Sequence, residues 1–102
     1  MKKLEPLSES YYYILLCLAK GENHGYGIMQ MTERLSGGDV KIGSGTMYGA
    51  TSNMMKKGWI QETMSSDGFE RRRLYRLTDA GREALRAEIT RLRRMIENAE
   101  EV

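Results

Sequence analysis

The chain has 102 residues, a single cysteine and a formal net charge of +2, with a sequence pI of about 8.8. This length is typical of one domain, and one cysteine excludes an intrachain disulfide. The longest apolar run, Ile14 to Ala19, is much too short to span a bilayer, and the N-terminal residues lack the apolar segment of a signal peptide. We therefore expect a cytoplasmic protein with no membrane partner.

Residues 8–20 are expected to form the first helix. Ser8 is a favourable N-cap residue, and Gly21 is a favourable residue to end the helix. The apolar side chains between them recur at helical spacing, as Tyr11, Ile14, Leu15 and Leu18. Cys17 lies between two leucines and is expected to be a small buried apolar residue, with redox sensing as the alternative.

A second helix is expected over residues 26–35, after a turn at residues 22–25. The segment Ser36–Asp39 holds two glycines and ends that helix, and residues 40–42 are expected to be extended. His24, the only histidine, is interpreted as a turn residue in front of the second helix. Because the chain has no second histidine and only one cysteine, we expect no metal site.

A third helix is expected over residues 44–57, with Ser44 as its N-cap and Gly58 directly after its end. Apolar and small residues recur on one side of this helix at helical spacing, as Met47, Ala50, Thr51 and Met54. This side is therefore expected to face the core.

Residues 59–64 and 69–77 are expected to be the two strands of a hairpin. The segment Ser65–Gly68 between them ends in Asp-Gly, which is a strong hairpin signal. Alternation along the second strand places Tyr75 and Leu77 on one face.

The last helix is expected to begin after the N-cap residue Thr78 and to run to about Asn98. An apolar seam follows it at coiled-coil-like spacing, as Leu85, Ile89, Leu92 and Ile96. This seam is longer than a three-helix core needs, so we expect these four residues to form a dimerisation surface with a second copy of the chain.

The expected order of three helices, two strands and a long helix is that of a winged helix domain with one extra helix. The predicted fold is mainly α with a small β-hairpin: a winged helix-turn-helix plus a long C-terminal dimerisation helix. We expect residues 1–77 to form the DNA-binding domain and residues 78–102 the dimerisation helix, within one structural unit.

The exposed side of the predicted third helix is polar and has little bulk, since three glycines lie in or next to its first half. In a helix-turn-helix, the second helix of the motif enters the major groove. The candidate DNA-binding residues on it are Ser44, Thr46, Tyr48, Ser52, Asn53 and Lys56. The alternative is an ordinary solvent-exposed face, for which glycine is a poor residue because it costs about 1 kcal/mol per interior helix position.

Basic residues gather around the predicted hairpin. Seven of the 16 Lys and Arg residues flank it: Lys56, Lys57, Arg71, Arg72, Arg73, Arg76 and Arg82. Alternation places cations on both faces of the second strand, which fits a wing that lies along DNA phosphates. Arg71, Arg72 and Arg73 are therefore candidate DNA-binding residues, and the alternative is protection of an edge strand by charge.

Four short blocks stand in a recognisable order along the chain: residues 24–28 (HGYGI), 45–50 (GTMYGA), 58–60 (GWI) and 73–82 (RLYRLTDAGR). Together they resemble the PadR family of bacterial winged helix regulators. The resemblance implies a dimer built through the C-terminal helix, which usually acts as a repressor and is often relieved by a small molecule. It also implies DNA contacts from the third helix and the wing, by Ser44, Thr46, Tyr48 and the Arg71–Arg73 segment.

The sequence departs from the family pattern in one block. Residues 51–55 (TSNMM) lack the leucine-rich pattern that usually follows the tyrosine, so the inward packing of the third helix is expected to be looser. We expect only one helix after the wing, which resembles the shorter form of the family without a larger C-terminal effector domain.

Tyr11, Tyr12 and Trp59 are candidate residues of a pocket for a small aromatic effector. The alternative is that they pack the first helix against the last helix and the wing. The eight methionines are interpreted as core residues, with an adaptable ligand surface as the alternative. No nucleophile–base pair, phosphate loop or paired carboxylates can be identified, so we expect neither catalysis nor a cofactor.

The sequence therefore predicts a homodimeric, sequence-specific transcriptional regulator that binds a near-palindromic operator in double-stranded DNA. Thr46, Ser52 and Asn53 are expected to read bases, while Lys56 and the wing arginines contact phosphates. Two alternatives stay open: a protein-interaction module that has lost DNA binding, and a small-molecule sensor with no DNA role.

Overall fold

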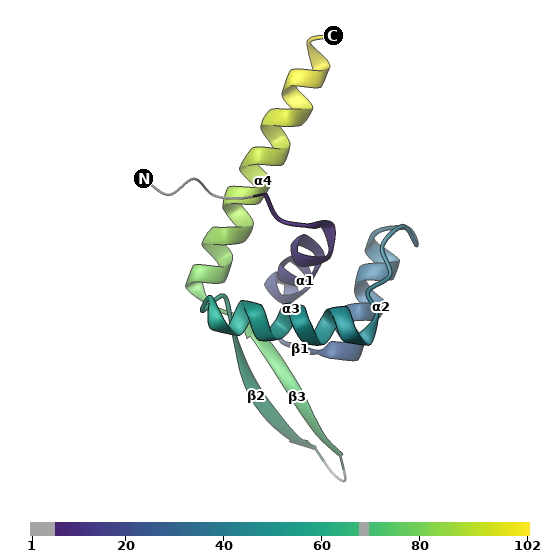
Figure 1. Cartoon of the computed structure of the whole chain (residues 1–102), viewed down its shortest axis with the longest axis vertical. Coiled ribbons are helices and arrows are strands. Elements are labelled where there is room, and N and C mark those ends of the chain that lie inside the picture. Colours follow the sequence, from purple (N-terminus) through teal and green to yellow (C-terminus); the bar gives the residue numbers. More distant parts are fainter. Residues whose placement is uncertain (1–5, 68–69) are drawn as a thin grey trace.

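The computed structural model of the chain describes residues 6–67 and 70–102, and the side chains of these residues except 65–67 and 70–71. Within them lie four helices and a small sheet (Figure 1), in the order α1 (Glu9–Lys20), β1 (Asn23–His24), α2 (Gly25–Leu35), α3 (Ser44–Lys56), β2 (Ile60–Asp67), β3 (Glu70–Leu77) and α4 (Asp79–Glu100). The expected class, mainly α with a β-hairpin followed by a long last helix, is confirmed.

Two helices begin at the N-cap residues that the sequence predicts. The Ser8 hydroxyl accepts a hydrogen bond from the Tyr11 backbone N–H at 3.1 Å. The Thr78 hydroxyl accepts one from the Gly81 backbone N–H, also at 3.1 Å. Each bond satisfies a backbone donor that the first helical turn leaves without an intrahelical partner, and this fixes where α1 and α4 start.

The predicted N-cap of α3 is wrong by one residue. Gly43 is the N-cap, makes no side-chain capping bond, and has an extended backbone. Its carbonyl accepts the Met47 backbone N–H at 2.9 Å, so the helix already includes Ser44 as its first residue. The Ser44 side chain is therefore exposed at the start of α3 and does not cap the helix.

The sheet has three strands in the order β1-β3-β2, where a two-stranded hairpin was expected. The prediction of a turn at residues 22–25 was wrong, because Asn23 and His24 form β1 and pair antiparallel with Tyr75 and Leu74. A strand of two residues is too short to show alternation, and its pairing partner lies far along the chain. The added strand attaches the start of α2 to β3.

The hairpin of β2 and β3 is longer than predicted and projects away from the helices (Figure 1). The antiparallel register continues to the pair Asp67 and Glu70, so residues 65–67 belong to β2 and not to the predicted turn. Residues 68–69, which the sequence assigned to the end of that turn and the start of the next strand, lie outside the described residues.

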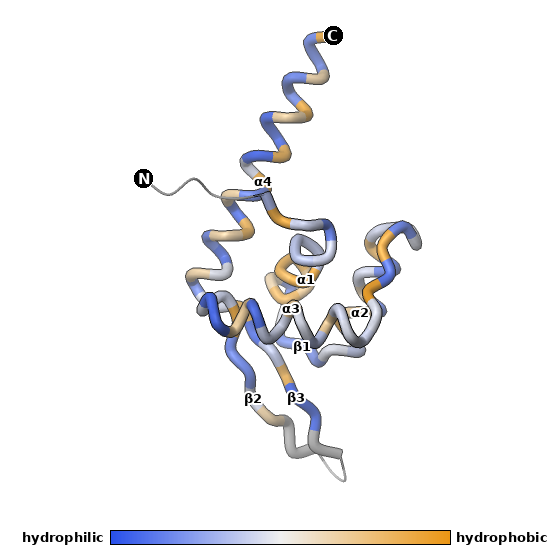
Figure 2. Tube along the Cα trace, viewed as in Figure 1, coloured by the Kyte–Doolittle hydropathy of each residue, from blue (hydrophilic) through white to orange (hydrophobic). Residues whose placement is uncertain are grey.

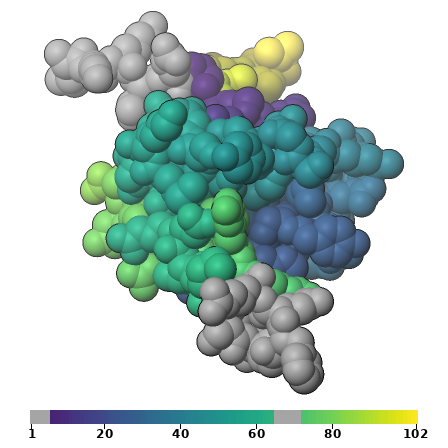
Figure 3. All heavy atoms as spheres, turned by 60° about the horizontal axis from the view of Figure 1, so that its bottom comes forward, coloured from purple at the N-terminus to yellow at the C-terminus, as the bar shows by residue number. Residues whose placement is uncertain are grey.

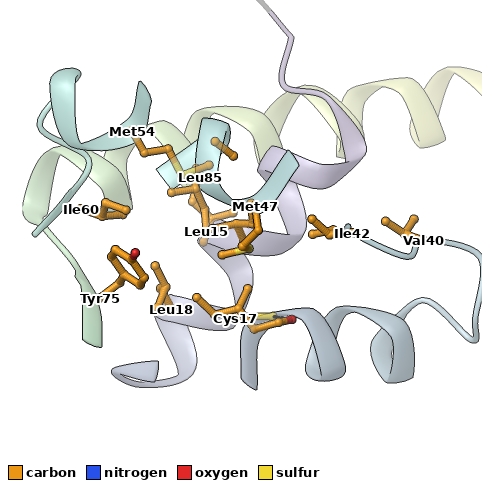
Figure 4. Packing of buried hydrophobic residues seen from close by; sticks show 13 residues of the cluster. Leu15, Cys17, Leu18, Val40, Ile42, Met47, Met54, Ile60, Tyr75 and Leu85 are labelled. Atoms are coloured by element: carbon orange, nitrogen blue, oxygen red, sulfur yellow. Dashed lines mark hydrogen bonds between the residues drawn. The ribbon is translucent and has the colours of Figure 1, made fainter. Parts of the chain in front are cut away.

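The core gathers around α1, whose Ile14 and Leu15 are fully buried. Every helix and both long strands contribute to it (Figure 4), including Ile28 from α2, Met47 and Met54 from α3, Ile60 from β2, Tyr75 from β3 and Leu85 from α4. The predicted inward side of α3 is confirmed, since all four of its residues are buried. Cys17 is also buried, as expected, and burial raises the pKa of its thiol.

The two halves of α4 have different surroundings. The first half packs on α1 and β3, whereas the second half projects beyond the rest of the chain (Figure 1). Leu85, predicted for the dimerisation seam, is only 6% exposed and belongs to the chain's own core. Among the described residues, no helix is long and apolar enough to cross a membrane.

A buried carboxylate ties the N-terminal segment to α4. Glu88 is 5% exposed and accepts two hydrogen bonds from the Arg91 guanidinium, both at 2.8 Å. It also accepts the Leu7 backbone N–H at 3.2 Å. The hydrogen bonds from Arg91 hold the pKa of the Glu88 carboxyl below its usual value, although burial alone would raise it.

Candidate nucleic-acid interface

One side of the molecule brings together α3, the start of α2 and the wing formed by β2 and β3. Seen from that side, α3 lies next to α2, with the wing strands beside both (Figure 3). A Cβ atom placed on Gly25 at the start of α2 would lie 3.8 Å from the Met47 side chain of α3, so the two helices come close to each other there. The three elements therefore offer one continuous surface to a partner.

The outer side of α3 is open and polar, as the sequence predicts. Ser44 and Thr46 are exposed, and the Tyr48 side chain is 67% exposed. A Cβ atom placed on Gly45 or Gly49 would meet nothing within 4 Å, so these glycines are not required by packing inside the chain. Because Gly45 and Gly49 have no side chains, the backbone of another molecule can approach the helix closely.

Three further candidate residues lie in the second half of α3. Lys56 is exposed, but Ser52 is half-buried and so less accessible than expected. The exposed Asn53 donates a hydrogen bond from Nδ2 to the Tyr11 hydroxyl of α1 at 2.9 Å. The sequence could not reveal this contact, because Tyr11 and Asn53 lie 42 positions apart and neither helical pattern depends on the other.

The wing arginines are held by neighbours on adjacent strands. Arg73 forms an ion pair with Glu62 of β2 at 3.3 Å, which partly offsets its charge. Arg72 is exposed, and its Nη1 lies 3.1 Å from Nε2 of His24. The side chain of Arg71, the third candidate, lies outside the described side chains.

His24 is a residue of this surface that the sequence interpretation placed in a turn. Its Nδ1 accepts the Gly27 backbone N–H at 3.0 Å, so its side chain caps α2. Histidine is not among the preferred N-cap residues, which is why the sequence did not indicate this role.

The aromatic residues proposed for an effector pocket pack against the core. Tyr11, Tyr12 and Trp59 are half-buried beside the buried cluster, and Lys57 lies over the Trp59 ring with its Nζ 5.2 Å from the centroid. A pocket at His24 and another at the base of the wing are lined by other residues than these three aromatic ones.

The distal half of α4 exposes apolar side chains. Ile89 and Leu92 are half-buried, and Met95 and Ile96 are 53% and 59% exposed. Apolar and charged residues alternate along this half of the helix (Figure 2), whereas the wing is mostly hydrophilic. Of the predicted seam, Ile96 is therefore exposed and Leu92 half-buried, while Ile89 is half-buried against the core.

Comparison with known proteins indicates one family. A model of the transcriptional regulator PadR-like family matches residues 14–87. An uncharacterised 37.1 kDa protein in transposon TN4556 of Streptomyces fradiae is 33% identical over 88 residues, covering 86% of this chain and 24% of that protein. The chain thus spans about a quarter of the length of the curated relative that it matches.

Solved structures share the winged helix fold. A transcriptional regulator from Clostridium thermocellum has a TM-score of 0.78 at 22% identity, covering 89% of each chain. A PadR family transcription regulator from Clostridium difficile has a TM-score of 0.78 at 24% identity, covering 92% of this chain and 97% of the other. Bacillus subtilis PadR in complex with operator DNA has a TM-score of 0.74 at 26% identity, covering 83% of this chain and 48% of the other.

Proposed function

Because this chain belongs to the PadR-like family of transcriptional regulators, we propose that it is a homodimeric repressor of a near-palindromic operator in double-stranded DNA. The observation that carries the proposal is the common surface of α3, the start of α2 and the wing. There an exposed polar helix with open glycines lies beside exposed arginines. Bacillus subtilis PadR, which is 26% identical, has been crystallised with operator DNA, and this likeness supports the same ligand class here.

In this proposal α3 enters the major groove and the wing lies along the backbone. Thr46 and Asn53, whose side chains are both exposed, contact base edges. Ser44 and Tyr48 contact phosphates near the start of α3, and Lys56, with the wing arginines, adds the sequence-independent part of the affinity. Ser52, being half-buried, is assigned a smaller part.

The dimer in the proposal forms through the distal half of α4. Ile89, Leu92 and Ile96 supply the seam, and residues 78–102 act as the dimerisation helix of the unit whose DNA-binding part is residues 1–77. Paired copies place two α3 helices on half-sites roughly 34–36 Å apart, about one helical turn of DNA. Exposed apolar side chains on a projecting helix support this arrangement, since water disfavours them.

Relief by a small aromatic ligand is the regulatory part of the proposal. Tyr11 belongs both to the candidate pocket and to the hydrogen bond with Asn53. A ligand that binds the Tyr11 hydroxyl would therefore weaken the hydrogen bond that holds Asn53, a candidate base-reading residue.

The cytoplasmic location expected from the sequence also stays a prediction.

The test is fluorescence anisotropy of the protein with its own promoter fragment and with a shuffled duplex, at about 50 and 200 mM salt. We expect the promoter to bind more tightly, and both affinities to fall steeply with salt, by about a thousandfold or more if six phosphates are contacted. Equal affinity for both duplexes contradicts specific binding at this promoter. No binding to either at low salt contradicts the DNA-binding proposal and favours the protein-interaction module.

A further inference from the structure

Two side chains of opposite charge flank the exposed apolar centre of the distal half of α4. Ile96 is 59% exposed where the helix projects beyond the rest of the chain (Figure 1). Arg93 lies three positions before it and Glu100 four positions after it. Seven residues make close to two helical turns, so Arg93 and Glu100 lie on the same side of α4, about 10 Å apart along its axis.

The chain itself does not use either of these charges. Within the described part of the chain, the side chains of Arg93 and Glu100 are exposed and make no hydrogen bond or ion pair. Arg91 differs from them, because its guanidinium donates two hydrogen bonds to the buried Glu88, both at 2.8 Å. Arg93 and Glu100 are therefore available to a partner that covers Ile96.

Two copies of α4 can pair in two orientations, and only one brings these opposite charges together. In an antiparallel pair the twofold axis is perpendicular to the helices. With that axis near Ile96, Arg93 of one protomer lies beside the partner's Glu100, and the same contact repeats on the other side of the axis. A parallel pair instead places Arg93 level with the partner's Arg93, and Glu100 level with the partner's Glu100.

We propose that Arg93 and Glu100 form two symmetric ion pairs between protomers, which select an antiparallel second copy of this chain as the partner of the distal half of α4. Charges beside an apolar seam act on orientation and partner choice more than on affinity. The inference rests on the proposed homodimer. It adds to that homodimer the orientation of the helices and two residues outside the predicted seam.

Charge reversal at either position should turn both ion pairs into repulsive contacts. R93E brings negative side chains together across the axis, and E100R brings positive ones together. Each variant alone should therefore dimerise about tenfold more weakly than the wild type in sedimentation experiments. High salt should reduce the difference, since it screens exposed charges.

Combining the two substitutions should restore the contacts. The double variant R93E/E100R exchanges the two charges and should dimerise like the wild type. In an equal mixture of R93E and E100R, one helix is negative at both positions and the other is positive. Their heterodimer should therefore rise from about half of all dimers, as in random pairing, to about nine-tenths, and native mass spectrometry separates the species by mass.

The matched control uses another pair of exposed charges on the same helix. Arg94 and Glu101 are also seven positions apart, but they lie on the side of α4 opposite Ile96. R94E and E101R make the same changes in net charge as R93E and E100R. Each should dimerise like the wild type, and their mixture should pair at random.

Disulfide formation tests the orientation separately. In an antiparallel pair with its axis near Ile96, the two cysteines of V102C are about 15 Å apart along the helices, beyond the reach of a disulfide. In a parallel pair they are level with each other. V102C should therefore resist oxidative crosslinking, while I96C, close to the axis, should crosslink. The wild type is the negative control, because Cys17 is buried.

The outcomes separate the ion pairs from the homodimer on which they rest. If the wild type dimerises but R93E and E100R dimerise as tightly as R94E and E101R and mix at random, the ion pairs are wrong and the homodimer stands. Efficient crosslinking of V102C overturns the antiparallel orientation. If the wild type is a monomer at every concentration tested, the proposed homodimer is wrong, and the ion pairs are wrong with it.

Discussion

The surface of α3 and the wing and the distal half of α4 are both exposed, but they leave different chemistry uncovered. The first presents hydroxyls, an amide, glycines and arginines, while the second presents Met95 and Ile96 among charged residues (Figure 2). Polar groups of the first kind suit a hydrated, charged partner such as a nucleic acid. Apolar groups on a projecting helix suit a second apolar surface.

In the function that we propose, the first region serves DNA recognition and the second serves assembly of the dimer. The glycines of α3 meet nothing inside the chain, whereas Gly81 at the start of α4 is enclosed by Trp59 and Leu77. Internal packing therefore requires glycine at position 81 but not at positions 45 and 49. Substitutions in the two regions should consequently change different measured quantities.

The largest effect is expected from I96D in the distal half of α4. A carboxylate at this exposed position should not disturb the fold of one chain but should separate the protomers, since an unpaired charge is costly in an apolar seam. Sedimentation should then report monomers, and affinity for an operator should fall about a hundredfold or more because the two half-sites no longer bind together. A dimer that persists in I96D would contradict the assigned seam, and R94Q is the control.

The next effect contrasts G81A with G49A. A Cβ atom at Gly81 would collide with the Trp59 carbonyl oxygen and the Leu77 side chain, so G81A should lose about 1–3 kcal/mol of stability. G49A should gain up to about 1 kcal/mol, because its Cβ meets open space and alanine favours helix. Thermal unfolding at one fixed protein concentration checks both.

The G49A variant also tests whether the glycines of α3 are needed for DNA binding. G49A should bind DNA less tightly than the wild type despite its higher melting temperature, because a methyl group now stands on the approach surface. If G49A is both more stable and equally active in DNA binding, close approach at this position is not required.

A smaller effect is expected from the link between α3 and α1. N53A should lower the preference for an operator over a shuffled duplex by about tenfold, the typical value of one base contact. Y11F removes only the hydroxyl that Asn53 contacts, and it should reduce the preference by less. The double variant Y11F/N53A should resemble N53A, and independent losses would show that Tyr11 does not act through Asn53.

The smallest effect concerns the packed half of α4, at Glu88. Since Arg91 lowers the pKa of this carboxyl in the folded chain, its contribution to stability is present above the unfolded value of about 4.3 and is lost as the pH falls through the folded pKa. The wild type should therefore be more stable than E88Q at pH 7, with the difference disappearing in acid. Urea unfolding across that pH range measures it, and a constant difference would contradict the assignment.

Local signals explain what the sequence predicted well. The N-caps Ser8 and Thr78 and the inward side of α3 depend on residues within one or two helical turns of each other. The two halves of the predicted interface, α3 and the wing, also follow from element order. Their described side chains lie on one surface, and their contacts with DNA stay a prediction.

Long-range contacts explain what the sequence did not predict. The strand β1 forms only because β3 supplies its partner, and the Asn53–Tyr11 bond joins residues 42 positions apart. His24 caps α2 and reaches Arg72 only after that strand has formed. For Leu85 a local pattern was misleading. Its spacing fits the dimerisation seam, but its side chain is already buried in the core of a single chain.

The most direct measurement is selection of bound sequences from a pool of random duplexes, because the operator does not have to be chosen before the experiment. A dimer with one α3 per half-site should enrich an inverted repeat whose half-sites are centred about 10–10.5 base pairs apart. The I96D variant should enrich single half-sites or no motif. A protein that binds the pool with strong salt dependence but enriches no motif would contradict sequence-specific recognition by α3.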